Sequence, residues 1–339
     1  MNSPATQLTE LLSQDLTSST ASLNVHQTTP DGVSYRQQVS AINVLSYSTR
    51  MTAHGCPRRF LLEKATAANS SDETDNVDFL YGHAVGGGVQ NFAVSHDIRS
   101  AVWESFLAWK GDLLLELPKS KKSFFHATMA VLQFAGHIGD LLEDWEIATT
   151  ADGKPAIELA FRLDLGNGYY YMGHIDAVLW HPERRQFMVL ELKTTKFNSV
   201  DDAQFKNSDQ ALGYSLVVDI LAGLLNADAG NYEVLYLVYK TSMLEWERLP
   251  FVKSRQQRAN WLFQLRMDCS ILDMYRENKH FPTHGENCYN FFRQCEFFGI
   301  CDMKSHVEEL SKHLTIADGS AEVKGVTFYF NINEMKEIV

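Results

Sequence analysis

Two carboxylates and a lysine lie within one short stretch of alternating apolar and polar residues. They are Asp176, Glu191 and Lys193, in the segment GHIDAVLWHPERRQFMVLELKTT that spans residues 173–195. Period-two alternation puts Glu191 and Lys193 on one face of a strand. If residues 182–185 form a hairpin loop, Asp176 lies opposite Glu191, roughly 5 Å away between Cβ atoms. Carboxylates that close repel each other unless a cation lies between them.

The chemistry of the ligands indicates which cation this would be. Mg²⁺ and Mn²⁺ prefer oxygen ligands and retain several waters, so Asp176, Glu191 and the main-chain carbonyl of Leu192 would make an open site for either ion. The ion would polarise a phosphodiester and generate hydroxide near neutral pH, and Lys193 would reach the attacking water or the phosphate. The same residues are also consistent with a solvated hairpin end that carries a surface ion pair.

Two further side chains are candidate ligands of the same ion. Glu158 lies on the preceding predicted strand, and His174 shares a strand face with Asp176. Most other histidines are scattered along the chain and are better interpreted as surface or core residues.

A predicted helix over residues 202–225 follows the hairpin. On it Lys206, Gln210 and Tyr214 recur at i, i+4 and i+8, and therefore share one stripe. That stripe could offer a cation, an amide and an aromatic ring to a nucleic-acid strand. The alternative is a contact between helix and sheet in which Tyr214 is buried.

The order of the predicted elements indicates an α/β fold with a mixed sheet flanked by helices. Residues 78–147 are mostly helical by pattern, and residues 253–278 form a late helix. The predicted strands cover residues 156–165, 169–180, 186–193, 232–240 and 243–250.

The chain divides into five segments by composition and pattern. They are a flexible leader (1–38), an N-terminal segment with a helical region (39–150), the core (151–252), a late helix with a cysteine cluster (253–305) and a tail (306–339). The tail includes a possible strand at VTFYFNI.

Composition limits the classes of function. A chain of 339 residues with 45% hydrophobic residues can bury a full core. Its net charge of −12 argues against a broadly basic coat for nucleic acid, so any such contact must be a local channel. We find no Gly-x-x-x-x-Gly-Lys-Ser/Thr loop for phosphates, no signal peptide and no apolar run that could cross a bilayer. We therefore expect a cytoplasmic protein without membrane contact.

The five cysteines are the second signal. In a reducing cytoplasm, clustered thiols usually bind a metal or are simply buried, rather than forming disulfides. Three of them form Cys288-x₆-Cys295-x₅-Cys301, and Cys56 lies far upstream in Gly-Cys-Pro-Arg-Arg. Cys269 falls within the late helix and is predicted to belong to the core.

Several of these segments, in this order, resemble the PD-(D/E)XK nuclease superfamily, and specifically its RecB-like branch with iron–sulfur clusters. That branch includes CRISPR-associated and phage exonucleases. The matching pieces are SYSTRMTAHGCPRRFLLEK, YGHAVGGGVQ, Asp176 with Glu191-Leu192-Lys193, Gln210-Ala-Leu-Gly-Tyr214 and the late cysteines. The resemblance implies a restriction-endonuclease-like core, with a helical N-terminal insertion and a C-terminal cysteine segment.

The resemblance also implies roles for individual residues. Asp176 and Glu191 would be metal ligands, Lys193 the catalytic lysine, and Gln210 with Tyr214 a DNA-contacting motif. Many relatives carry a histidine ligand after a Gly-x-x-x spacing on an early helix, whereas Gly82 is followed at that position by Gly86. The run Gly86-Gly87-Gly88 would weaken a helix, so we expect it to permit close backbone approach or to mark a break.

For the cysteines, the resemblance implies one [4Fe–4S] cluster held by one early and three late thiolates. Its ligands would be Cys56, Cys288, Cys295 and Cys301. Zinc and cysteines that bind no metal are the alternatives. The spacing lacks the short C-x₂-C pairs usual in structural zinc sites, yet it is also wider than the late spacing common in relatives.

The sequence therefore predicts a Mg²⁺- or Mn²⁺-dependent exonuclease for single-stranded or end-frayed DNA. Its setting would be a bacterial or phage-infected cell, with recombination or CRISPR-adaptation proteins as partners. Two other functions fit the same residues: a non-catalytic DNA-binding or complex-forming subunit, and a structure-specific endonuclease that cuts flaps or junctions.

Overall fold

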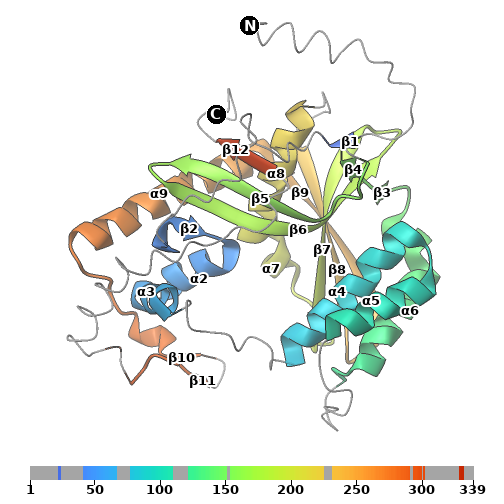
Figure 1. Ribbon diagram of the computed structural model, residues 1–339, viewed down its shortest axis with the longest axis horizontal. Helices are drawn as coiled ribbons and strands as arrows, with labels where there is room; N and C mark the ends of the chain where they lie inside the picture. The colour runs from blue at the N-terminus through green and yellow to red at the C-terminus, as the bar shows by residue number, and fades with distance from the viewer. Residues whose placement is uncertain are drawn as a thin grey trace, which may run out of the picture.

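A mixed sheet of eight strands forms the centre of the protein (Figure 1). The computed structural model describes residues 22–23, 41–66, 77–109, 121–150, 153–224, 231–290, 293–299, 301 and 328–331. The main path of the sheet runs β12-β5-β6-β7-β8-β9, and β2 and β3 both pair with β6. The eight strands are β2 (Val44–Leu45), β3 (Glu146–Ile147), β5 (Ile157–Gly166), β6 (Tyr169–His181), β7 (Gln186–Thr195), β8 (Asn231–Lys240), β9 (Glu245–Ser254) and β12 (Phe328–Asn331).

Two small strand pairs lie outside this sheet. Strand β1 (Ser22–Leu23) runs parallel to β4 (Thr149–Thr150), and β10 (Tyr289–Asn290) pairs with β11 (Arg293–Gln294). The helices are α2 (Tyr47–Gly55), α3 (Pro57–Thr66), α4 (Val77–Ser95), α5 (Ile98–Trp109), α6 (Phe124–Leu142), α7 (Asp202–Lys206), α8 (Asp209–Leu224) and α9 (Arg255–Glu277), with 3₁₀ turns at Ala41–Asn43 and Gly285–Asn287. Among the described helices, none combines the length and the apolar character needed to cross a bilayer.

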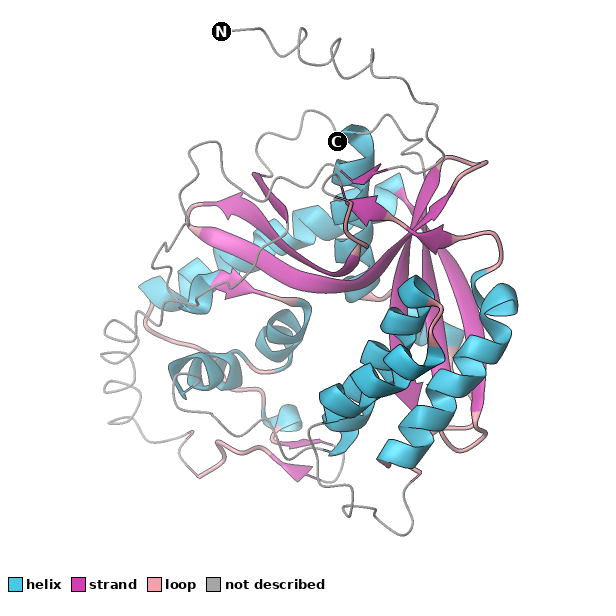
Figure 2. Cartoon of the chain, turned by 45° about the vertical axis from the view of Figure 1, so that its right-hand side comes forward, coloured by secondary structure: helices cyan, strands magenta, loops and turns pink. Residues whose placement is uncertain are grey.

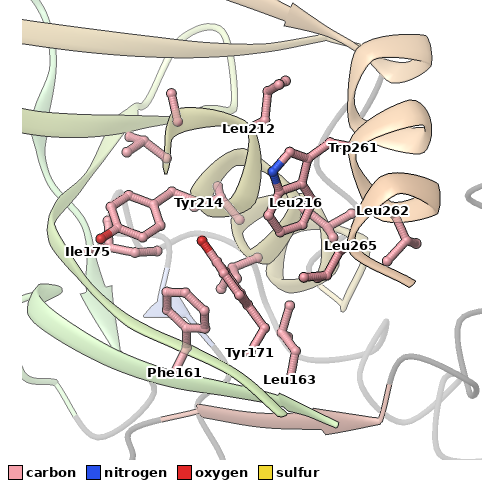
Figure 3. Close-up of a cluster of buried hydrophobic side chains, with 14 of the residues drawn as sticks. Phe161, Leu163, Tyr171, Ile175, Leu212, Tyr214, Leu216, Trp261, Leu262 and Leu265 are labelled. Carbon is pink, nitrogen blue, oxygen red and sulfur yellow. The ribbon is translucent and has the colours of Figure 1, made fainter. Parts of the chain in front are cut away.

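Helices cover both faces of the sheet (Figure 2). Val189 and Val234 face the layer formed by α8 and α9, whereas Leu190 and Leu235 face α4, α5 and α6. Because helices cover both faces of β7 and β8, successive side chains of these strands are buried on one face or the other, and the strands are nearly continuous in apolar residues. Figure 3 shows the first layer, where Trp261 of α9 lies beside Leu216 of α8.

The sheet divides at the ends of two strands. Strand β6 pairs with β7 only from His181 to Ala177, and its remaining length pairs with β5. Strand β7 continues beyond Leu190 with β8 alone. In Figure 1, β5 and β6 accordingly sweep to the left while β7 and β8 run downward. We call the place where β6 and β7 separate the fork; it lies at Asp176 and Glu191.

The structure confirms the predicted fold class and most predicted elements. The hairpin turns at residues 182–185, because His181 pairs with Gln186, and β12 forms within VTFYFNI. The single helix predicted over 202–225 is wrong: α7 ends at Lys206 and α8 begins at Asp209, as separate helices. Apart from β1 and β12, the predicted leader and tail lie outside the described residues.

The glycine run does not break its helix. Helix α4 continues through Gly86, Gly87 and Gly88 without interruption, so of the two expectations only close approach is confirmed. A Cβ built at Gly88 would lie 2.5 Å from Val131 Cγ2 and 3.1 Å from the carbonyl oxygen of Ala101. Helices α4, α5 and α6 therefore meet at a point where no side chain fits.

We predict that Gly88→Ala lowers the free energy of unfolding by about 1–3 kcal/mol, because the added methyl overpacks the three-helix contact. Gly86→Ala is the matched control: no atom lies within 4 Å of the place that its Cβ would take, so it should raise stability by about 0.5–1 kcal/mol. Denaturant unfolding of both variants measures the difference. Equal stabilisation by the two substitutions would contradict the close packing at Gly88.

Candidate active site

Asp176, Glu191 and Lys193 come together at the fork, as the hairpin register predicts. The pairing of Ala177 with Leu190 places Asp176 and Glu191 opposite each other at the next step along the strands. Glu191 is only 2% exposed, whereas Asp176 and Lys193 are partly exposed. The Leu192 N–H no longer has a main-chain partner on β6, and donates instead to Asp176 Oδ2 at 2.7 Å.

A hydrogen-bonded chain runs from the fork to helix α8. Lys193 Nζ lies 2.5 Å from Glu191 Oε1 and donates to Gln210 Oε1 at 3.1 Å. Gln210 Nε2 in turn donates to the hydroxyl of Tyr214 at 3.1 Å. Lys193 is therefore held between a carboxylate of its own strand and an amide of the first turn of α8.

The fork is electrostatically strained. Burial, with the neighbouring Glu191 charge, raises the pKa of Asp176 well above its usual range. Burial also raises the pKa of Glu191, against the opposing effect of the Lys193 ion pair. Burial lowers the pKa of Lys193, but Glu191 and Asp176 outweigh it and raise the pKa overall. Lys193 thus stays protonated, and the two carboxylates lack full compensation for their charge.

The donor atoms at the fork suit a hard divalent cation. Glu191 Oε2 is buried and accepts no hydrogen bond, although a buried carboxylate oxygen normally has a partner. Oxygen atoms of Asp176, Glu191 and Leu192 are the kinds of ligand that Mg²⁺ and Mn²⁺ prefer. Within the part of the chain that the structure describes, no three His, Cys, Asp or Glu side chains form a ready-made ligand group. Lys193 binds the other oxygen of Glu191, Oε1, which leaves Oε2 as the oxygen available to an ion.

Comparison with known proteins identifies the family. The model of the PD-(D/E)XK nuclease superfamily matches residues 44–302, which cover most of the chain and include the fork. This chain belongs to the PD-(D/E)XK nuclease superfamily. No curated protein matches it. The solved structure of SSO0001 is similar over 62% of this chain and 84% of its own, at 12% identity and a TM-score of 0.23, a likeness too weak to support any argument.

Members of this superfamily are metal-dependent nucleases, and DNA is the substrate that the fold implies. Of the additional ligand candidates, Glu158 lies on β5 opposite Asp176, where its carboxylate accepts a hydrogen bond from Gln90. His174 is exposed on β6, opposite Ala160. Glu158 is therefore the candidate for which the described residues show a hydrogen-bonded connection to the fork, through Gln90.

Gln90 contacts the fork, although the Gly-x-x-x spacing counted from Gly82 does not point to it. The spacing Gly-x-x-x, counted from Gly82, ends at Gly86, but the same spacing counted from Gly86 ends at Gln90. Applying the Gly-x-x-x spacing to each glycine of the run, and not only to Gly82, would have pointed to Gln90. Gln90 is buried on α4 and donates to Glu158 and to the main chain of Asp176.

Arg50 is the second residue that the sequence did not reveal. Its buried guanidinium donates to Asp268 Oδ2 of α9 at 2.6 and 2.8 Å and to Asp209 Oδ2 of α8 at 3.0 Å. Its Cζ lies 5.4 Å from the ring centroid of Trp261. Arg50 therefore joins α2, α8 and α9, and fixes the residue that precedes Gln210.

The predicted stripe on the helix after the hairpin is only partly formed. Lys206 is exposed on α7, a separate helix from that of Gln210 and Tyr214, so the three side chains do not follow one helical face. The Tyr214 ring is 6% exposed and packs edge-on against Phe161, with ring centroids 5.7 Å apart. This burial agrees with the alternative in which Tyr214 belongs to the contact between helix and sheet (Figure 3).

The segments that carry the cysteines lie side by side. Gly55 O accepts hydrogen bonds from Asn287 Nδ2 at 2.6 Å, and Arg58 N donates to Pro282 O at 3.0 Å. The Cys295 N–H donates to Cys288 O at 2.8 Å. Cys56 is buried, whereas the late cysteines Cys288, Cys295 and Cys301 are partly exposed.

Cys269 behaves as the sequence predicts for a core residue. It is 9% exposed and belongs to the apolar cluster beneath α9. Burial raises the pKa of its thiol to about 12. The thiolate form that a metal requires is therefore strongly disfavoured at this position.

We predict that Tyr214→Ala lowers the free energy of unfolding by about 3–5 kcal/mol, because it removes a buried ring from the core. Tyr214→Phe keeps the ring and loses only the acceptor of the Gln210 hydrogen bond, so its cost should stay below about 1.5 kcal/mol. Thermal and urea unfolding distinguish the two. A stable Tyr214→Ala variant that binds DNA weakly would instead favour a direct contact between this ring and DNA.

Proposed function

We propose that this protein is a Mg²⁺- or Mn²⁺-dependent DNA exonuclease that acts on single-stranded or end-frayed DNA. The observation that carries the proposal is the fork, where a buried carboxylate, a second carboxylate and a protonated lysine meet. In this proposal Asp176, Glu191 and the Leu192 carbonyl hold the ion. When bound, the ion would polarise the phosphodiester and lower the pKa of an attacking water.

The protein's own residues would orient the reaction. Lys193, kept protonated by its carboxylate neighbours, can donate a charge-assisted hydrogen bond to the scissile phosphate. Gln210 restricts the directions in which the lysine can point, because its amide oxygen accepts from Nζ. In this proposal Tyr214 supports Gln210 from the core, since its hydroxyl accepts the amide N–H.

The chain just beyond β7 offers a surface for unpaired bases. Phe197 is 65% exposed and follows Lys193 by four positions along the chain, and Lys196 Nζ lies 5.8 Å from the centroid of its ring. An exposed aromatic ring beside a cation is the combination that stacks bases and attracts a single-stranded backbone. Since the whole chain carries a net charge of −12, a contact of this local kind is what its composition permits.

We further propose that Cys56, Cys288, Cys295 and Cys301 hold a [4Fe–4S] cluster with a structural role. The hydrogen bonds of the Gly55 region to residues 282–287, together with the β10–β11 hairpin, support this proposal because they bring the early and late segments together. The thiols do not form a metal-ligand group within the described residues, so zinc and metal-free cysteines stay as alternatives.

The non-catalytic subunit is less well supported than the enzyme. A chain that had lost turnover would have no physical reason to retain a buried carboxylate, Glu191, of which one oxygen pairs with Lys193 and the other has no partner. A structure-specific endonuclease would use the same fork, and differs from an exonuclease in whether a free DNA end is needed. The resemblance suggests DNA recombination or CRISPR adaptation as the setting.

We predict that Asp176→Asn, Glu191→Gln and Lys193→Met each reduce Mn²⁺-dependent DNA cleavage by about a hundredfold or more. The carboxylate variants lose a charged ligand, and the lysine variant keeps its length without its charge. Turnover of fluorescent single-stranded DNA measures the loss, with circular dichroism to confirm folding. Full activity in any one variant would remove that residue from the site.

The same assay separates the possible modes of cleavage. An exonuclease should degrade linear single-stranded DNA and leave closed circular single strands intact, whereas an endonuclease should nick the circles or cut flaps. Arg184→Met is a suitable control, because Arg184 is exposed in the turn at residues 182–185, at the opposite end of β7 from Lys193. It should leave cleavage unchanged.

We predict that anaerobically purified protein carries iron and sulfide and absorbs visible light through thiolate-to-iron charge transfer. Alanine at Cys56, Cys288, Cys295 or Cys301 should remove this absorbance and lower the melting temperature. Cys269→Ala is the matched control and should keep the iron. Colourless protein with one zinc would show that the metal is zinc, and protein with neither metal would refute the cluster.

A further inference from the structure

Gln90 reaches the fork from the helical layer opposite α8. It lies on α4, which contacts β6 and β7, and it is 7% exposed. Its Nε2 group donates to Glu158 Oε1 at 2.8 Å and to the carbonyl oxygen of Asp176 at 3.0 Å. One buried amide group thus uses its two N–H bonds to connect a carboxylate of β5 with the main chain of β6.

Glu158 stands in an unusual backbone position. Ile157 pairs with Ala177 and Leu159 with Ile175, so Glu158 is the residue opposite Asp176. Its φ of +47° is in the left-handed region, which non-glycine residues adopt rarely and mostly where the surroundings enforce it. From this position the Glu158 carboxylate accepts the hydrogen bond of the Gln90 amide.

Glu158 also lies close enough to the two other carboxylates to affect them. Its charge contributes to the raised pKa of both Asp176 and Glu191, after burial and nearer groups. The pairing of the strands puts Glu158 opposite Asp176 and Asp176 opposite Glu191, although within the described residues no three such side chains form a ready-made ligand group. Carboxylates that bind a metal are themselves commonly oriented by hydrogen bonds from outer residues.

We propose that Gln90 is a positioning residue that holds Glu158 as a third carboxylate of the metal site. Gln90 would then stand at the helical position where relatives carry a histidine ligand. This inference rests on the proposed function. The amide is suited to the task because it is a neutral donor: it orients Glu158 without neutralising the charge that would attract the ion. A lysine or arginine at position 90 would form a stronger bond and compete with the ion.

Direct Mn²⁺ binding to the full chain tests this proposal without relying on cleavage. Gln90→Met keeps the length of the side chain and removes both hydrogen bonds, and Glu158→Gln removes the charge at an exposed position where folding should be preserved. Each substitution should weaken Mn²⁺ affinity by about tenfold, as measured by electron paramagnetic resonance of free Mn²⁺. The double variant should bind no more weakly than Glu158→Gln alone, because Gln90 acts through Glu158.

Two controls make the outcome decisive. Gln264→Met changes an exposed glutamine of α9 and should leave affinity unchanged. Asp176→Asn should abolish binding if the proposed function is right. Normal Mn²⁺ affinity in Glu158→Gln would overturn the inference, and so would additive losses in the double variant. If Asp176→Asn also binds Mn²⁺ normally, the proposed metal site itself is wrong. If only Asp176→Asn loses Mn²⁺ affinity, the metal site stands, and the roles proposed for Gln90 and Glu158 are refuted.

Discussion

Strands β6 and β7 stop exchanging hydrogen bonds beyond Ala177 and Leu190, and the candidate site occupies the place where they part. A separation of this kind leaves main-chain donors without partners, which is costly in a buried region. The Asp176 carboxylate satisfies the Leu192 N–H, so one side chain both closes the end of the ladder and lies in the site. Side chains from helices on both faces of the sheet contact residues at this place, Gln90 from α4 and Gln210 from α8.

The polar groups at the fork are arranged so that neutral amides hold the charged ones. Gln90 comes from α4 on one face of the sheet, and Gln210 comes from α8 on the other. Buried charges are expensive unless they are paired or hydrogen-bonded, and the amides satisfy individual atoms without cancelling net charge. Glu191 Oε2 is left without a partner, which is the arrangement expected of a site that completes itself with a cation.

The sequence predicts the parts of this structure that follow from local pattern. Strand alternation and a four-residue loop are enough to place Asp176 opposite Glu191, because register in a hairpin follows from loop length. The division between α7 and α8 escapes prediction because the i, i+4, i+8 spacing continues across Asn207 and Ser208. Arg50 could not be assigned, since its partners lie 159 and 218 positions away in the chain and are brought near only by tertiary packing. Gln90 follows Gly86 at the Gly-x-x-x spacing, but its contacts with Glu158 and Asp176 likewise arise only in the folded chain. The same limit applies to Tyr214, whose burial depends on Phe161.

Contacts among the helices join the cysteine-bearing segments to the fork. The 282–287 segment holds Gly55 at the end of α2, and the same helix carries Arg50. Arg50 binds Asp209 in the first turn of α8, and the next residue is Gln210, which contacts Lys193. Each step is a buried or short-range contact between rigid elements, so a crosslink between the early and late segments would restrain α2 and, through it, the direction of Lys193. Loss of the crosslink should therefore act first on stability and only then on chemistry.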